Sequence, residues 1–265
     1  MPSQANESIM RLNVERAGYG GLPVLRNLLL SLTAGEITAF CGPNGSGKST
    51  ALKLMRGLLS ADAGGCELHG KPIEDYSAKS LARELAMLSQ SPSAPEDMSV
   101  SDLVMLGRYA HRGLLGSATR EDRDAADAAL HSVDMHAHRE RSLSTLSGGQ
   151  QQRVWLAMVL AQASPVILLD EPTNHLDIQH ALQLLQLLRD LCNSRHKTIV
   201  VVLHDLNLAA GHADRLVLFQ DGRIAADGPV ADVLSESTVE RVFQVHCQIV
   251  RNPNEPPRFI PIRAL

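Results

Sequence analysis

The chain has 265 residues, of which 44% are apolar and 20% are charged, and its formal net charge at pH 7 is −4. This length fits one large domain or two small ones, and the high apolar content excludes a disordered chain. The slightly acidic balance gives no electrostatic reason to expect DNA, RNA or an anionic membrane surface as a partner. Aromatic residues make up only 3% of the chain, which argues against a surface that stacks on bases.

Cysteine spacing and apolar runs exclude two further classes of protein. The cysteines lie far apart in sequence and form no C-x-x-C pair, at Cys41, Cys66, Cys192 and Cys247. This usage indicates a reduced chain with neither a disulfide framework nor a zinc site. The longest apolar runs, such as residues 200–203, are too short to cross a bilayer. We therefore expect a chain that does not span a membrane.

The first residues and the second half of the chain predict strands that alternate with helices. Strand-like patterns occur at residues 8–15, 24–32, 36–41, 166–169, 198–203 and 215–219. Helical periodicity occurs at residues 49–59, 178–192 and 205–210. Such alternation predicts an α/β fold with a mainly parallel sheet covered by helices on both faces.

The middle of the chain has a different texture. Between residues 91 and 163 it predicts helices at 100–108, 120–134 and 149–161. We expect a helical insertion there, so that residues 1–90 and 164–265 form the α/β core of one domain.

A glycine-rich segment between a predicted strand and helix fits the pattern G-x-x-x-x-G-K-[ST]. Its glycines allow backbone N–H groups to surround phosphate oxygens at a helix N-terminus. The lysine would contact the β- and γ-phosphates, and the following serine hydroxyl would bind Mg²⁺. The predicted nucleotide-binding residues are Gly42, Pro43, Asn44, Gly45, Ser46, Gly47, Lys48, Ser49 and Thr50.

Adjacent carboxylates follow the predicted strand 166–169, at Asp170 and Glu171. Many buried strands end in an acidic residue, so this pattern alone is weak. After the glycine-rich phosphate-binding loop of residues 42–50, the P-loop, these carboxylates supply what phosphoryl transfer needs. Asp170 would hold Mg²⁺, and Glu171 would polarise the attacking water.

A third motif begins the predicted helix 149–161, with Ser147, Gly148, Gly149 and Gln150 after Leu146. The backbone N–H groups of Ser147 and Gly149 are predicted to form a second anion site. One subunit has no use for a second phosphate site, but such a site facing the γ-phosphate of a partner subunit is useful. A flexible helix entry is the alternative for the motif in isolation.

In this order the motifs resemble the ATP-binding-cassette family over almost the whole chain. Tyr19 resembles the aromatic residue that stacks on adenine, and Gln90 the glutamine that contacts Mg²⁺ and water. Leu176-Asp177 resembles the loop that crosses to the partner's site, and His204 resembles the switch histidine near the γ-phosphate.

The resemblance implies a P-loop NTPase core, an N-terminal antiparallel β part and a helical subdomain insertion. It implies ATP hydrolysis with Glu171, Gln90 and His204 as catalytic residues, and Mg²⁺ held by Ser49, Gln90 and Asp170. It also implies a homodimer with composite ATP sites beneath integral membrane permease subunits. The chain would be located at the cytoplasmic face of the cell membrane. A periplasmic or lipid-anchored substrate-binding protein would be an indirect partner.

Two stretches narrow the subclass. Residues 98–111 and the tail 242–261 resemble ATPases of importers for iron–siderophore complexes, haem and cobalamin. An iron–siderophore complex is the favoured cargo, with haem and cobalamin as alternatives.

Asn174-His175 stands where many siderophore ATPases have Thr and an aromatic residue. The same pair occurs in soluble translation-associated cassette proteins, so an ATPase acting on nucleic acid or the ribosome is the alternative of another class. An ATP-binding scaffold without turnover is a third hypothesis, against which Glu171 and His204 argue.

Other candidate sites are weaker. His131, His136 and His138 suggest metal binding, but we interpret them as solvated surface residues. Cys41 precedes the P-loop and is interpreted as packing rather than as a redox group. Trp155 is also interpreted as packing, with a permease contact as the alternative.

Overall fold

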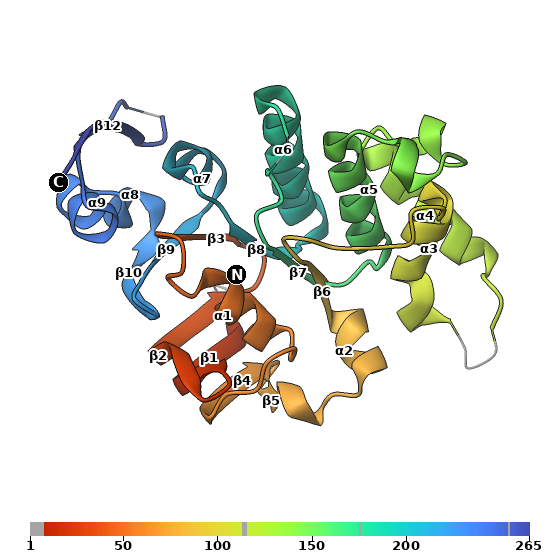
Figure 1. Cartoon of the computed structure of the whole chain (residues 1–265), viewed down its shortest axis with the longest axis horizontal. Helices are drawn as coiled ribbons and strands as arrows, with labels where there is room; N and C mark the ends of the chain where they lie inside the picture. The colour runs from red at the N-terminus through yellow and green to blue at the C-terminus, as the bar shows by residue number, and fades with distance from the viewer. Residues whose placement is uncertain (1–7, 113–115, 175, 254) are drawn as a thin grey trace, which may run out of the picture. The chain divides into compact units, whose positions relative to one another are not determined.

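The computed structural model falls into two compact units, residues 1–75 with 191–265 (unit 1) and residues 76–190 (unit 2). It describes residues 8–112, 116–174, 176–253 and 255–265 (Figure 1). The predicted boundaries, with residues 1–90 and 164–265 as the core of one domain and 91–163 as its helical insertion, stay a prediction.

An antiparallel sheet of order β2-β1-β4-β5 begins unit 1, drawn in red and orange in Figure 1. Its strands are β1 (Ser8–Tyr19), β2 (Leu22–Thr33), β4 (Ala63–Leu68) and β5 (Lys71–Pro72). The first two form a hairpin that turns at Gly20 and Gly21, both at positive φ, which glycine adopts without steric cost. Burial alternates along β1, so one face of the sheet is part of the core. Both predicted strands are confirmed, and each is longer than predicted.

Unit 1 also contains strands in the order β10-β9-β3-β8. They are β3 (Ile37–Cys41), β8 (Thr198–Val202), β9 (Arg215–Gln220) and β10 (Arg223–Pro229). Strand β3 pairs in parallel with β8 and with β9. Every residue of β3 and β8 is buried, as expected for strands covered on both faces. The predicted parallel strands are confirmed, and β10 adds an antiparallel edge.

The helix after the P-loop, α1 (Lys48–Met55), is shorter than the predicted helix 49–59. Gly57 has φ 71° and its N–H donates to the Leu54 carbonyl, while the Leu58 N–H donates to the Lys53 carbonyl. This pair of bonds is a Schellman motif, which ends the helix by satisfying its last carbonyls.

The end of the chain completes unit 1. It comprises α7 (Leu206–His212), α8 (Val230–Val233), α9 (Glu236–Phe243), β11 (Val245–Val250) and β12 (Arg258–Ala264). The Asn207 amide of α7 joins the last strand as a neighbouring strand would. It donates to the Phe259 carbonyl at 3.0 Å and accepts from the Phe259 N–H at 2.8 Å.

Unit 2 combines a parallel strand pair with helices. The pair is β6 (Leu85–Leu88) and β7 (Val166–Leu169). The helices are α2 (Ala78–Glu84), α3 (Val100–Leu106), α4 (Arg120–Ser132), α5 (Gly148–Ala161) and, as far as residue 190, α6 (Ile178–Arg195). Part of the predicted helix 100–108 is instead a 3₁₀ helix, Gly107–His111. A Cβ on Gly107 would lie 2.2 Å from the Met158 carbonyl oxygen, so glycine permits the close approach to α5.

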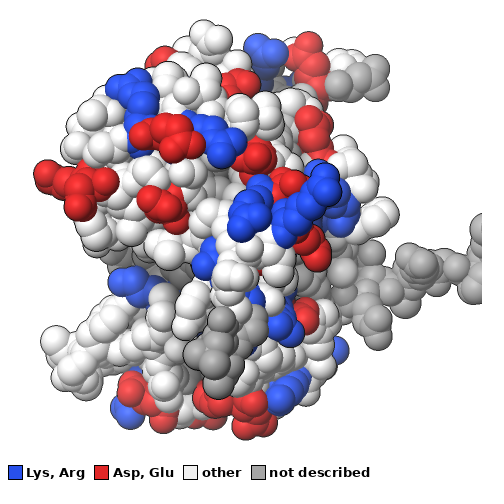
Figure 2. Space-filling model, turned by 90° about the vertical axis from the view of Figure 1, so that its right-hand side faces the viewer, with Lys and Arg blue, Asp and Glu red and all other residues white. Residues whose placement is uncertain are grey.

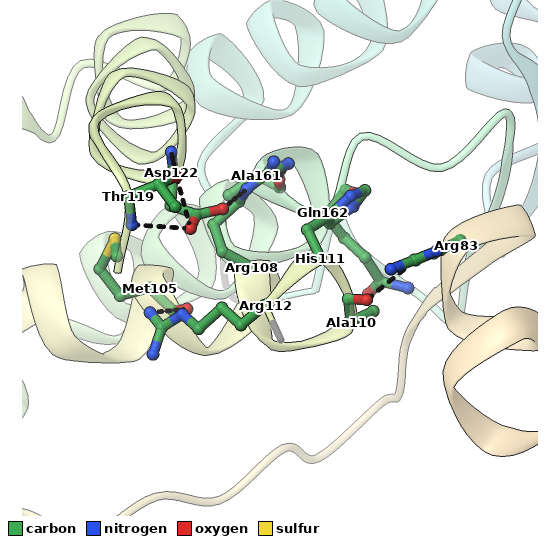
Figure 3. A network of polar contacts seen from close by, with 10 residues as sticks. All are labelled: Arg83, Met105, Arg108, Ala110, His111, Arg112, Thr119, Asp122, Ala161 and Gln162. Carbon is green, nitrogen blue, oxygen red and sulfur yellow. Dashed lines mark hydrogen bonds and ion pairs between the residues drawn. The ribbon is translucent and has the colours of Figure 1, made fainter. Parts of the chain in front are cut away.

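A buried ion pair ties α4 to its neighbours (Figure 3). Arg108 Nε lies 3.0 Å from Asp122 Oδ1, with both side chains at most 5% exposed, and Arg108 Nη1 donates to the Ala161 carbonyl. Asp122 also accepts from the Thr119 N–H in a capping box at the start of α4. Because these partners satisfy both charges, the pair links the 3₁₀ helix, α4 and α5 without leaving a buried charge unpaired.

Within the described part of the chain, none of the helices has the length and apolar character that a membrane crossing requires.

Candidate nucleotide-binding and hydrolysis site

The P-loop of unit 1 connects β3 to α1, as the motif predicts. Gly42 has φ 146°, and a Cβ there would lie 2.2 Å from the Phe219 carbonyl oxygen. Gly47 has φ 104° and precedes α1 without any side-chain cap. The helix therefore begins with N–H groups and a positive dipole end suited to an anion.

Two polar side chains in the P-loop are buried and suited to phosphate. Lys48 is 5% exposed, and its ammonium donates to the Gly42 carbonyl at 2.8 Å and the Pro43 carbonyl at 2.9 Å. The Ser46 hydroxyl is buried and has no hydrogen-bond partner among the described residues. A buried hydroxyl without a partner is costly, and a phosphate oxygen would satisfy it. The loop thus fits the triphosphate of a nucleotide.

The turn between β9 and β10 holds the P-loop from the other side. The Gly222 N–H donates to the Ser46 carbonyl at 3.1 Å, and the Gly222 carbonyl accepts from the Arg26 N–H at 2.9 Å. A Cβ on Gly222 would lie 1.8 Å from the Val24 carbonyl oxygen. Glycine is therefore required where this turn joins β2 to the P-loop, a link that the motif did not reveal.

Tyr19, the predicted adenine-stacking residue, ends β1 and is 45% exposed. The Lys53 ammonium of α1 lies 5.5 Å from the centre of its ring. This cation–π contact places the ring beside the helix that follows the P-loop.

His204, the predicted switch histidine, is exposed just after β8. The next residue, Asp205, caps α7 by accepting from the N–H groups of Asn207 and Leu208 at 2.7 and 3.1 Å. The capped helix start and the end of a buried strand therefore fix the backbone on both sides of His204.

In unit 2, Gln90, Asp170 and Glu171 meet where β6 and β7 end. The Asp170 N–H donates to the Leu88 carbonyl, and Gln90 Nε2 donates to Glu171 Oε2 at 2.7 Å. Asp170 is 2% exposed and Glu171 is 8% exposed. The same Glu171 oxygen accepts a hydrogen bond from Asn174 Nδ2, a contact absent from the sequence prediction. His175, the second residue of the Asn-His pair, lies outside the described residues.

The third motif forms the N-terminus of α5, where the structure differs from the sequence prediction. Ser147 and Gln150 make a capping box, in which Ser147 Oγ accepts from the Gln150 N–H and Gln150 Oε1 accepts from the Ser147 N–H at 3.0 Å. The Ser147 N–H, predicted to bind an anion, is therefore already bonded. An anion that used it would have to displace the Gln150 side chain.

The same helix contacts the segment after Glu171. Gln152 Nε2 donates to the Pro172 carbonyl at 3.1 Å, and the Asn174 N–H donates to the Glu171 carbonyl at 3.2 Å. We name residues 171–174 the Glu171 turn. Sequence reasoning missed Gln152 because a glutamine at the start of a helix resembles any solvated residue.

The structure shows the surroundings of several weaker candidates from the sequence, including the cysteine before the P-loop, two of the histidines and the tryptophan. Cys41 is fully buried, and burial raises the pKa of its thiol to about 12, so the reactive thiolate is disfavoured. The His131 and His136 rings stack with centroids 3.9 Å apart. In the described ranges, no group of three or more His, Cys, Asp or Glu side chains is arranged to hold a metal. Trp155 lines a hollow of about 340 Å³.

A P-loop at a helix N-terminus and a buried strand that ends in Asp170-Glu171 define a nucleoside triphosphatase of the P-loop class. The model of the ABC transporter family matches residues 25–174, and the chain belongs to this family. It is an ATP hydrolase of the ABC type.

The chain is also similar to curated proteins over most of its length. It is 43% identical to a probable siderophore transport system ATP-binding protein, YusV of Bacillus subtilis, covering 89% of this chain and 86% of that protein. It is 39% identical to the ferric enterobactin transport ATP-binding protein FepC of Escherichia coli, covering 93% and 92%.

Solved structures share the fold. An inward-facing structure described as a metal-chelate type ABC transporter contains a chain that matches with a TM-score of 0.82 at 27% identity, covering 97% of this chain and 98% of that one. The dimeric structure of MJ0796, a bacterial ABC transporter cassette, matches with a TM-score of 0.76 at 29% identity, covering 83% and 98%. The predicted fold class, a P-loop core with an antiparallel β part and a helical insertion, is confirmed.

Proposed function

We propose that the chain is the ATP-hydrolysing subunit of a bacterial importer for an iron–siderophore complex, bound to the cytoplasmic face of the cell membrane through permease subunits. The observation that carries this proposal is similarity over nearly the full length to YusV and FepC, which are named for siderophore and ferric enterobactin transport. The hydrolytic part rests on the buried Glu171 and its amide partners.

In this proposal the adenine stacks on Tyr19 and the phosphates bind residues 42–50. Mg²⁺ would be held by Ser49, Gln90 and Asp170, oxygen donors of the kind it prefers, and would neutralise charge on the phosphates. Glu171 accepts a proton from the attacking water, while Gln90 and His204 orient that water. ATP drives motion because it binds the closed dimer more tightly than the open one.

The proposed working unit is a homodimer with composite sites. Ser147, Gly148, Gly149 and Gln150 of one chain would contact the γ-phosphate bound by the partner. The dimeric structure of MJ0796 supports a paired arrangement. Mixing the variants Ser147→Arg and Lys48→Ala tests it: a mixed dimer has one site with both lesions and one with neither, so part of the activity should return. No recovery at any mixing ratio would contradict shared sites.

The permease is proposed to contact the helical part of unit 2. The hollow there is lined by residues including Pro92, Glu96, Leu143, Ser144 and Trp155. A cytoplasmic loop of the permease that enters this hollow would be displaced when α5 moves and would transmit that displacement to the permease.

On the face shown in Figure 2, Lys and Arg side chains are interspersed with Asp and Glu side chains, a pattern that does not favour nucleic acid as a partner of this face. A surface that follows a nucleic-acid backbone needs a continuous basic stripe instead.

Uptake measurements test the cargo. Cells carrying Lys48→Ala in place of the natural chain should lose uptake of iron-loaded siderophore while uptake of haem and cobalamin is unchanged. Loss of haem or cobalamin uptake alone would transfer the proposal to that cargo. Full uptake of all three would contradict the importer function.

A further inference from the structure

Two amide side chains converge on one carboxylate oxygen in the Glu171 turn. Gln90 Nε2 donates to Glu171 Oε2 at 2.7 Å, and Asn174 Nδ2 donates to the same oxygen. Glu171 is only 8% exposed, so its charge depends on such donors for stabilisation. Each donor therefore contributes to holding the carboxylate in a single orientation.

The backbone at Glu171 makes that orientation dependent on its neighbours. Its φ is +53°, a left-handed conformation that residues other than glycine adopt at a steric cost. The Asn174 N–H donates to the Glu171 carbonyl at 3.2 Å and closes the turn. Asn174 thus holds Glu171 twice, through the main chain and through the side chain.

The two amides are not equivalent. Gln90 lies two residues beyond β6, the strand that pairs in parallel with β7, so it contacts Glu171 from the end of a neighbouring strand. Asn174 lies three residues from Glu171 in the same closed turn, so it moves together with the carboxylate. Asn174 is therefore the donor that belongs to the same turn as Glu171.

We propose that Asn174 is a positioning residue for ATP hydrolysis: its side-chain amide donates to Glu171 Oε2 and directs the carboxylate toward the attacking water. The proposal rests on the proposed role of Glu171 as the group that accepts the proton of that water. The chemistry of the step is unchanged. Asn174 gains and loses no proton, and it sets the orientation from which Glu171 acts.

The test compares Asn174→Val with Asn174→Thr, side chains of nearly equal shape that differ in one methyl group and one hydroxyl group. Both keep the backbone bond that closes the turn, but only threonine keeps a donor for Glu171. We expect Asn174→Val to lower kcat about tenfold, with the KM for ATP changed by less than about twofold, and Asn174→Thr to retain most of the activity. Equal rates in the two variants, or a loss confined to KM, would overturn the proposal.

A double-mutant cycle with Glu171→Gln separates positioning from folding. If Asn174 acts through Glu171, Asn174→Val should not lower the residual rate of Glu171→Gln any further. An additional loss of about tenfold in the double variant would contradict the proposal. The melting temperature shows whether Asn174→Val folds, and if it does not, the comparison of Asn174→Thr with Asn174→Ala replaces it, because alanine keeps the backbone bond, donates nothing and adds no charge beside Glu171.

The same cycle distinguishes this inference from the function on which it rests. Full hydrolysis by Glu171→Gln would refute the role of Glu171 itself. An inactive Glu171→Gln together with a fully active Asn174→Val would refute only the positioning role.

Discussion

Gln152 Nε2 donates a 3.1 Å hydrogen bond to the carbonyl oxygen of Pro172, which joins the helix begun by Ser147 to the turn that contains Glu171. In a dimer with composite sites these two segments would serve different ATP molecules. In such a dimer the bond would be a direct link, inside unit 2, between the parts of one chain that serve the two sites.

Removing this link should slow hydrolysis without weakening ATP binding. We expect Gln152→Leu to lower kcat about fivefold, the equivalent of one hydrogen bond of about 1 kcal/mol, with the KM for ATP unchanged. Steady-state ATPase assays measure both constants. Gln186→Leu is the matched control, since that exposed glutamine bonds only to Asp190 among the described residues, and an equal loss in the control would remove the special role of Gln152.

Ser46 gives a prediction in which stability and binding separate. Its hydroxyl is buried without a partner among the described residues, so Ser46→Ala should leave the melting temperature of the nucleotide-free protein unchanged or slightly raised. The variant should bind ATP about tenfold more weakly, because a hydrogen bond to a charged phosphate is lost. Thermal denaturation with and without ATP measures both effects. A large loss of stability without ATP would contradict the assignment of this hydroxyl to the ligand.

Gly222 and Gly70 form a matched pair of glycines at positive φ, 74° and 71°. Alanine at either position carries a similar backbone cost of about 1 kcal/mol. A Cβ at Gly70 has no atom within 4 Å, whereas at Gly222 it would lie 1.8 Å from the Val24 carbonyl oxygen. Gly222→Ala should therefore lower the free energy of unfolding by about 2 kcal/mol more than Gly70→Ala does. It should also weaken ATP binding, because the turn between β9 and β10 bonds to Ser46. Equal effects in the two variants would contradict the role of this turn in holding the P-loop.

The buried pair Arg108–Asp122 predicts a dependence of stability on pH. The Thr119 N–H, with Arg108 adding to its effect, lowers the pKa of Asp122 from 3.8 to about 2. A lowered pKa contributes stability above the unfolded value, and this contribution is lost as the pH falls from about 4 to about 2. Asp122→Asn should cost about 3 kcal/mol at neutral pH, since it leaves the Arg108 charge buried, and the difference from the natural chain should shrink over that acidic range.

Asp124 supplies the control for this pair on the same helix. Its ion pair with Arg120 spans 3.8 Å, and its side chain is 70% exposed. Asp124→Asn should change the free energy of unfolding by less than about 0.5 kcal/mol at any pH. Denaturant titrations at several pH values measure both variants, and equal losses would show that burial of Asp122 has no special effect.

Sequence patterns predicted the parts of the fold that local periodicity and a motif define. The strand before the P-loop is a run of apolar residues buried on both faces, and the loop has a fixed spacing, so both were predictable. The end of α1 was predicted too late because the leucines after Met55 continue the helical pattern through the Schellman motif at Gly57.

Contacts between distant residues left no comparable pattern. Arg108 and Asp122 each look like ordinary surface residues in the sequence, and their pairing depends on how α4 packs. The contact of Asn174 with Glu171 requires the left-handed backbone at Glu171, which the sequence does not reveal. The capping box of Ser147 and Gln150 had a visible signal, the S-x-x-Q spacing, that the anion-site interpretation of the same residues overlooked.

The central claim is that ATP joins two copies of this chain and that Glu171 is needed to hydrolyse it. The most direct measurement is the molar mass of Glu171→Gln by gel filtration with light scattering, with and without ATP and Mg²⁺, alongside its ATPase rate. The account predicts a dimer that forms with ATP, persists because hydrolysis is blocked, and dissociates when ATP is removed. A variant that stays monomeric with bound ATP, or that hydrolyses ATP at the rate of the natural chain, would contradict it.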